Sequence, residues 1–119
     1  MLGPLLTERS KPELKNKSFS APGILHRAGV KFALMTDHGV ITIQYLPLQA
    51  GICVREGLDE YAALQAITIH AAEMIGLSEK IGSIKVGKDA DVTLFDGHPL
   101  ETRTHACLVV VNGQIVYER

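Results

Sequence analysis

Aromatic side chains are scarce in this sequence of 119 residues, which has no tryptophan, three phenylalanines and three tyrosines. A buried core must therefore consist mainly of aliphatic side chains. The composition is 46% hydrophobic and 21% charged, which excludes an intrinsically disordered chain. The length supports one modest core, but it is under half of the roughly 250 residues that a closed (β/α)8 barrel needs. A complete barrel within this chain is excluded.

Four further features are missing, and each argues against a class of protein. The 12 basic and 13 acidic residues give a net charge of −1, so the basic excess expected of a nucleic-acid-binding protein is absent. No apolar run approaches the roughly 20 residues of a membrane-spanning helix, and no signal-peptide pattern follows Met1. Cys53 and Cys107 are far apart and form no CxxC pair. We expect free thiols and a cytoplasmic protein without nucleic-acid or membrane partners.

Capping patterns predict several short helices in the first two thirds of the chain. Ser10-Lys-Pro-Glu13 has the form of a capping box and predicts a helix over about 11–17. Residues 20–22 predict the start of a second helix, which Gly29 ends. Three more helices are predicted further on: 48–56 closed by Gly57, one capped by Asp59, and 70–75 between Thr68 and Gly76.

The most apolar segment, residues 30–36, separates the second of these helices from the third. It is nearly continuous in apolar side chains and stops abruptly at Asp37-His-Gly39. A segment that is apolar on both faces is typical of a buried parallel strand in an α/β protein. Together with the preceding helix, the segment forms half of a βαβ unit.

The character of the sequence changes after about residue 80, where glycines separate short β-type segments. These segments are 83–86, 91–95, 106–111 and 114–118. Asn112-Gly113 lies between the last two and is a strong signal for a type I′ hairpin. We therefore expect two regions, an α/β region over 1–78 and a small all-β region over 79–119.

Asp37 is the candidate for chemistry that stands out from position alone. A carboxylate just after a buried parallel strand lies where α/β proteins place their active sites, and it can bind a metal or move a proton. The structural alternative is an aspartate that caps the following turn. The side chains of Asp37 and His38 diverge unless the backbone bends between them. No HxH or HExxH pattern and no cysteine pair completes a metal site.

Other catalytic patterns are absent. No GxSxG motif is present, and neither cysteine has an evident base. Residues 82–88 superficially resemble a phosphate-binding loop, but Asp89 follows where that motif needs Ser or Thr, so we interpret the stretch as strand, turn and strand. Asp89 and Asp91 are then expected to stabilise the tight turn over 87–90.

The ordered motifs of the chain resemble the C-terminal part of amidohydrolase-superfamily enzymes, and most closely the imidazolonepropionase-like metal-dependent hydrolases. The resemblance covers essentially the whole chain. It is carried by Gly3-Pro-Leu-Leu6, Ser10-Lys-Pro-Glu-Leu14, Pro22-Gly-Ile-Leu25, Ala33-Leu-Met-Thr-Asp-His38, Ala63-Leu-Gln-Ala-Ile-Thr68, Ile81-Gly-Ser-Ile-Lys-Val-Gly-Lys-Asp-Ala-Asp-Val92, Phe95-Asp-Gly-His-Pro-Leu100 and Val111-Asn-Gly-Gln-Ile-Val116. It implies the last βα elements of a TIM-type barrel over 1–78 and part of a composite β-sandwich over 79–119.

The same resemblance implies specific site residues and a cofactor. Asp37 corresponds to the family's aspartate that binds the metal and shuttles the proton of the attacking water, and His38 is a candidate for substrate binding. The cofactor implied for the full-length parent is a divalent metal, zinc, with iron or manganese as alternatives. The family's HxH motif and its other metal-binding residues have no counterpart here. We therefore expect a fragment that is inactive alone and binds no metal tightly.

Two functions follow as hypotheses. The first is a metal-dependent hydrolase of C–N bonds in cyclic amides, imidazolones or dipeptides, which acts on a small-molecule substrate. The second is a non-catalytic interaction or assembly module that retains the C-terminal fold. Because one barrel strand cannot close a barrel, its edges would be uncovered, and we expect a homo-oligomer that exchanges strands or helices.

Overall fold

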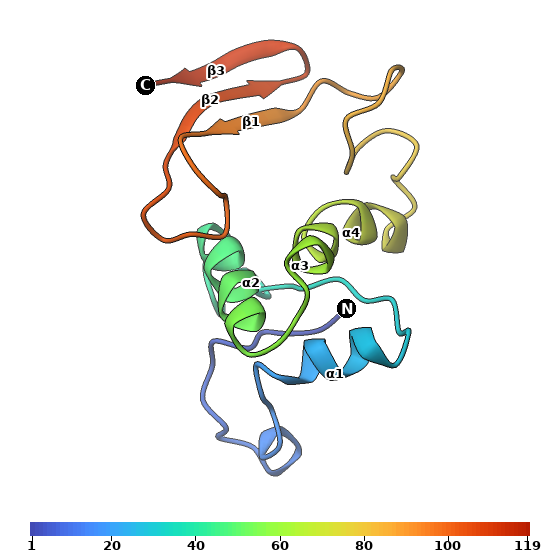
Figure 1. Cartoon of the computed structure of the whole chain (residues 1–119), viewed down its shortest axis with the longest axis vertical. Coiled ribbons are helices and arrows are strands. Elements are labelled where there is room, and N and C mark those ends of the chain that lie inside the picture. Colours follow the sequence, from blue (N-terminus) through green and yellow to red (C-terminus); the bar gives the residue numbers. More distant parts are fainter.

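The computed structural model describes all 119 residues, and it places every helix before residue 78 and every strand of the sheet after it (Figure 1). The helices are α1 (Ala21–Arg27), α2 (Leu46–Arg55), α3 (Glu60–Ala66) and α4 (Ile69–Met74), with 3-10 turns at Pro12–Leu14 and Ile43–Tyr45. The strands are β1 (Val92–Phe95), β2 (Ala106–Val111) and β3 (Gln114–Glu118). None of the helices has the length and hydropathy needed to cross a membrane.

Two extended segments lie parallel to each other near the N-terminus and are connected through α1. The N–H of Leu2 donates to the carbonyl of Ala33 at 2.7 Å, and the N–H of Met35 donates to the carbonyl of Leu2 at 3.0 Å. These bonds form a parallel bridge between Leu2 and Leu34. The arrangement has the topology of a strand, a crossover helix and a parallel strand.

The prediction of a regular strand over 30–36 is wrong in extent. The segment is extended, and its residues 32–34 are buried as expected, but it pairs through a single bridge. On the side away from Leu2, the N–H of Leu34 donates to the carbonyl of Ala66 in α3, at 3.0 Å. The segment is therefore flanked by a single bridge to Leu2 on one side and by the end of α3 on the other, not by two strands as in a regular parallel sheet.

The predicted helix ends are confirmed wherever a glycine or Asp59 marks them. Asp59 Oδ1 accepts a hydrogen bond from the N–H of Ala62 at 2.8 Å, which caps α3. Gly29, Gly57 and Gly76 follow α1, α2 and α4 with φ of 74°, 100° and 73°. This left-handed conformation ends a helix at little cost only in glycine.

Two of the predicted caps are wrong. Ser10 does not cap a helix, and the predicted helix over 11–17 is reduced to the 3-10 turn Pro12–Leu14, which begins after Lys11 without a side-chain cap. Thr68 precedes α4, but its hydroxyl donates to the carbonyl of Leu64 at 2.6 Å. The Thr68 hydroxyl therefore binds back to α3 and does not accept from an N–H of α4, so α4 also begins without a side-chain cap.

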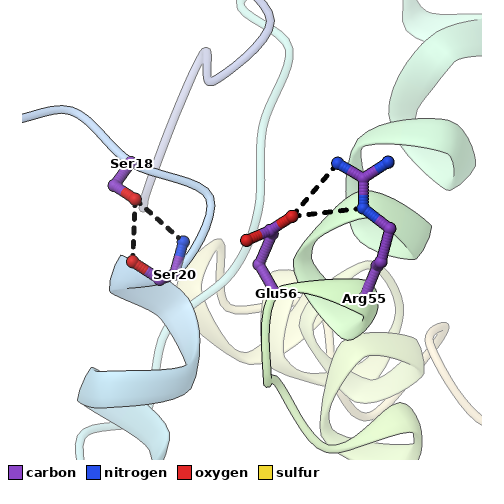
Figure 2. A network of polar contacts seen from close by, with 4 residues as sticks. All are labelled: Ser18, Ser20, Arg55 and Glu56. Atoms are coloured by element: carbon purple, nitrogen blue, oxygen red, sulfur yellow. Dashed lines mark hydrogen bonds and ion pairs between the residues drawn. The ribbon is translucent and has the colours of Figure 1, made fainter.

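Local polar contacts lie at the ends of two helices, as Figure 2 shows. Before α1, Ser18 Oγ accepts from the N–H of Ser20 at 3.1 Å and lies 2.7 Å from Ser20 Oγ. At the end of α2, Arg55 Nη2 lies 3.1 Å from Glu56 Oε1. Both partners of this ion pair are exposed, so it adds little to stability.

The core lies between α2, α3 and the two extended segments. Alanines at the facing positions of α2 and α3 let the helices approach closely, and Ala50, Ala63 and Ala66 have no exposed surface. The ten core residues are Leu5, Phe32, Leu34, Ala50, Cys53, Leu58, Ala62, Ala63, Ala66 and Leu100. As the composition predicts, all but one are non-aromatic.

The sheet has the order β1-β2-β3, and both pairs of strands are antiparallel. The predicted hairpin is confirmed, because Asn112 and Gly113 both have positive φ, 50° and 77°, as a type I′ turn requires. Asp91 Oδ1 accepts from the N–H of Asn112 at 2.7 Å. Its carboxylate therefore stabilises the hairpin rather than the turn over 87–90, where we expected it.

The predicted strand over 83–86 is wrong, because residues 77–89 form a succession of turns. The ammonium group of Lys88 lies inside this loop and donates to Ser83 Oγ at 2.7 Å, to the carbonyl of Ile81 at 3.2 Å, and to the carbonyl of Ser78. The three acceptors surround the Lys88 ammonium group, and their hydrogen bonds to it hold the loop together without pairing to the sheet.

Candidate functional site

Asp37 lies at the carboxyl end of the second extended segment, where the chain turns sharply. Its φ is 53°, which is unusual for a residue other than glycine. The N–H of Val40 donates to the backbone carbonyl of Asp37 at 2.8 Å and closes the turn. The side chain is exposed, and no hydrogen bond or ion pair engages the carboxylate. Asp37 therefore does not cap the turn with its side chain, which was the structural alternative.

Thr36, the residue before Asp37, is 1% exposed, and its hydroxyl has no hydrogen-bond partner. A buried hydroxyl without a partner costs about 1–3 kcal/mol, and such groups are rare in folded proteins. The end of this segment therefore holds a polar group that the chain's own residues do not satisfy.

Gln49 fixes the two extended segments to each other, and it is fully buried in α2. Its Oε1 accepts from the N–H of Leu5 at 2.9 Å, and its Nε2 donates to the carbonyl of Met35 at 3.0 Å. The side chain thus replaces part of the missing strand pairing, two residues before Asp37. We did not single out Gln49 from the sequence, although a lone glutamine within the apolar stretch of α2 is a detectable signal.

The His38 side chain engages the chain that follows it. Its Nδ1 accepts from the N–H of Ile43 at 3.1 Å, at the start of the 3-10 turn that precedes α2. Nε2 makes no hydrogen bond with the protein. The side chain of His38 is exposed, so this second nitrogen is accessible.

Three of the other four histidines have partners elsewhere in the chain. His70 Nδ1 lies 3.2 Å from the carbonyl of Phe32, His98 Nε2 lies 3.8 Å from Glu60, and His105 Nδ1 lies 3.5 Å from Asp96. No three His, Cys, Asp or Glu side chains of the chain lie close enough to bind one metal ion. Asp37 fits a metal as a single accessible carboxylate ligand, whereas a catalytic zinc site usually has three protein ligands.

A hollow of about 500 Å³ adjoins Asp37 at the carboxyl ends of the two extended segments. Its walls come from the loop after the first segment and from the turn after the second. The side chains that line it include Leu6, Glu8, Lys11, Leu14, Val40 and Ile41. This is the end of a parallel arrangement at which α/β proteins bind their ligands.

The two cysteines are free, as expected, and Cys53 is unsuited to nucleophilic chemistry. Burial in the core raises the pKa of its thiol from 9.0 to about 12. The thiolate is the reactive form, so a thiol kept protonated in an apolar environment is inert.

The candidate site consists of Asp37, the adjoining hollow and His38. Gln49 joins the two extended segments next to it.

Comparisons of the sequence with protein families and with individual proteins point to the same family. Residues 6–116 match the model of the amidohydrolase family. The chain is 38% identical over 112 residues to the imidazolonepropionase of Geobacillus sp. (strain WCH70), a match that covers 87% of this chain and 26% of that protein. It is 29% identical over 99 residues to amidohydrolase tasK of Hapsidospora irregularis, a match that covers 83% of this chain and 10% of that protein.

Solved structures agree with this result. The crystal structure of an amidohydrolase from Thermotoga maritima MSB8 has a TM-score of 0.94 and 39% identity, over 99% of this chain and 31% of that one. The crystal structure of a Xaa-Pro dipeptidase with bound methionine in its active site has a TM-score of 0.73 and 27% identity, over 87% of this chain and 26% of that one. The chain thus spans about a quarter of the imidazolonepropionase and just under a third of the Thermotoga protein. It belongs to the amidohydrolase family.

Proposed function

We propose that this chain is the C-terminal part of a metal-dependent amidohydrolase that hydrolyses the C–N bonds of cyclic amides, imidazolones or dipeptides. The observation that carries the proposal is the position of Asp37: an accessible, unpaired carboxylate on a left-handed residue, directly after a parallel extended segment. Backbone strain of this kind is often found at functional sites. The names of the relatives, which include imidazolonepropionases and a Xaa-Pro dipeptidase, support C–N bonds as the target.

In this proposal Asp37 is both a metal ligand and the group that moves the proton. A divalent metal, zinc or alternatively iron or manganese, would supply Lewis acidity and lower the pKa of water. The carboxylate accepts a proton from the attacking water and then donates it to the leaving nitrogen. Its exposure and its lack of an internal partner leave its oxygens free for both tasks.

The remaining parts of the proposal concern His38 and the two regions. The free Nε2 of His38 binds the substrate, while its Nδ1 bond to Ile43 sets the orientation of the ring.

Residues 1–78 are the last βα elements of the barrel, and residues 79–119 are part of a composite β-sandwich. The other metal ligands come from outside this chain, so the chain alone is inactive.

A chimera tests the proposal directly. This chain replaces the matching 31% of the Thermotoga maritima amidohydrolase, whose structure it follows at a TM-score of 0.94. We expect the chimera to contain metal and to hydrolyse an amide substrate of the unmodified Thermotoga protein. Asp37→Asn should lower kcat by about 10²–10⁴-fold, the usual contribution of a general acid–base residue.

The matched control is Asp89→Asn, which changes an exposed aspartate in the loop before β1 in the same way. We expect full activity from the control chimera. If the Asp37→Asn chimera keeps both its metal and its activity, Asp37 has neither proposed role and the proposal fails.

The exposed sheet favours a second candidate, a non-catalytic assembly module. Every residue of the edge strand β3 is exposed, and Ile115 and Val116 are 62% and 60% exposed. An uncovered edge with apolar side chains is a template for pairing with another chain. This candidate predicts a homo-oligomer formed through β3, which gel filtration detects. Its interactions should be insensitive to Asp37→Asn but should be lost on introduction of charge at Ile115.

A further inference from the structure

The hollow beside Asp37 has one apolar wall that the proposed hydrolysis does not use. Leu6 and Leu14 contribute from the loop after the first extended segment, and Val40 and Ile41 contribute from the turn after Asp37. The charged side chains that line it are Asp37, Glu8 and Lys11, so the lining carries charges of both signs. No aromatic side chain lines the hollow to stack against a ring.

The loop that forms this wall is held in place by Lys17. The lysine ammonium donates to the carbonyl of Thr7, to Thr7 Oγ1 and to the carbonyl of Glu8. Thr7 Oγ1 in turn donates to the carbonyl of Pro4 at 3.3 Å. Lys17 is part-buried, whereas Lys11 and Lys15 are exposed.

We infer that this hollow is the substrate subsite for an uncharged, branched aliphatic group beside the scissile C–N bond. The inference rests on the proposed function, because it takes Asp37 as the reacting end of the substrate site. Burial of an isobutyl group against aliphatic walls favours a leucine-like substituent over a hydrogen by about tenfold or more. Lys17 is a positioning residue here, since it shapes the wall and touches no substrate.

Binding of two neutral amides to the 119-residue chain tests the inference. The probes are N-acetyl-leucine methylamide and N-acetyl-glycine methylamide, followed by methyl NMR. We expect the leucine compound to bind about tenfold more tightly and to shift the methyl signals of Leu14, Val40 and Ile41. Equal affinities, binding of neither compound, or shifts confined to other methyl groups would each overturn the inference.

Two pairs of variants sharpen the test. Val40→Thr keeps the side-chain volume at a position that is 57% exposed, so the fold tolerates it, and it should reduce leucine binding by about threefold. Val30→Thr makes the same change at a 46% exposed position, at the end of the extended segment 30–36 that lies away from Asp37, and should have no effect. Lys17→Met should abolish the preference for leucine, whereas Lys15→Met should preserve it. If Val40→Thr and Val30→Thr behave alike, the wall is not the binding surface.

Asp37→Asn separates this inference from the proposed function. If the leucine preference persists in this variant while the Asp37→Asn chimera keeps full activity, the hollow binds an aliphatic group but the proposed catalytic role of Asp37 is wrong. If the chimera loses activity but the chain binds both amides equally, the catalytic role holds and the aliphatic subsite is wrong.

Discussion

The helical region over 1–78 and the sheet region over 79–119 are stabilised in different ways. Leu100 is the only one of the 16 buried residues that lies after residue 78. It reaches the core from the loop between β1 and β2, while the strands themselves bury no residue completely. The helical region therefore has a core of its own, whereas the sheet is held mainly by its backbone ladder and its hairpin.

The difference shows that a hairpin needs less tertiary support to form than a parallel strand. Asn112-Gly113 sets the turn between β2 and β3 locally, although Leu94 and Tyr117 remain 53% and 47% exposed. The extended segment over 30–36 has a more apolar sequence but forms a single bridge, because parallel pairing depends on neighbours that are distant in sequence. A sheet of three strands without a packed face is only marginally stable.

The largest expected effect comes from the same substitution made once in each region. Leu34→Ala removes a side chain that is 2% exposed and should lower the free energy of unfolding by about 2–5 kcal/mol. Leu94→Ala removes one that is 53% exposed and should change it by under about 0.5 kcal/mol. Urea unfolding followed by circular dichroism measures both. Equal losses would show that the sheet is buried in solution and would contradict the comparison.

The buried glutamine gives the next largest effect. Gln49→Leu keeps the helix but leaves the N–H of Leu5 and the carbonyl of Met35 without partners. We expect a loss of about 2–4 kcal/mol, since each unsatisfied buried group costs about 1–3 kcal/mol. Gln44→Leu is the control, because Gln44 is exposed and makes no side-chain hydrogen bond. The same unfolding curves measure this pair, and a Gln49→Leu variant as stable as its control would show that the bridge contributes nothing.

The two cysteines, one in each region, should differ in their reactivity toward thiol reagents. Cys107 in β2 is partly exposed, whereas Cys53 in α2 is fully buried. We expect a thiol reagent such as DTNB to label Cys107 in the folded chain and Cys53 only after unfolding. Labelling rates of Cys53→Ser and Cys107→Ser assign the two phases. Rapid labelling of Cys53 would mean that the helical core opens readily.

The last effect, which is absent near neutral pH, is a dependence of stability on alkaline pH. Burial raises the pKa of Cys53 from 9.0 to about 12, so between these values the folded state keeps a proton that the unfolded state has lost. Because the unfolded state binds fewer protons, the free energy of unfolding falls as pH rises through this window. In Cys53→Ser this part of the decline should be absent. Identical alkaline profiles for the two proteins would contradict it.

The sequence predicted those features of the fold that depend on neighbouring residues. The glycine ends of three helices, the Asp59 cap and the Asn112-Gly113 turn each follow from the conformation that one or two residues prefer. The Ser10 cap and the strand over 83–86 were wrong. In both cases the side chain of a lysine in the same loop, Lys17 or Lys88, binds backbone carbonyls up to ten residues earlier and organises the loop instead.

The site was predicted in part. The position of Asp37 follows from the apolar segment before it, and its identity as a candidate ligand follows from the resemblance to amidohydrolases. The partners of the Gln49 side chain were not predictable, because Leu5 and Met35 lie 44 and 14 residues away in the sequence. We also did not predict the left-handed φ of Asp37 or the unpaired hydroxyl of Thr36. The resemblance itself is confirmed by the family match over residues 6–116.

The central claim is that this chain contributes one metal ligand, Asp37, to a centre that is completed from outside it. The most direct test is the zinc content of the purified chain after dialysis, measured by elemental analysis beside that of the Thermotoga chimera. We predict far less than one zinc per chain for the chain alone and stoichiometric metal in the chimera, which Asp37→Asn lowers. Tightly held, stoichiometric zinc in the chain alone would contradict the claim.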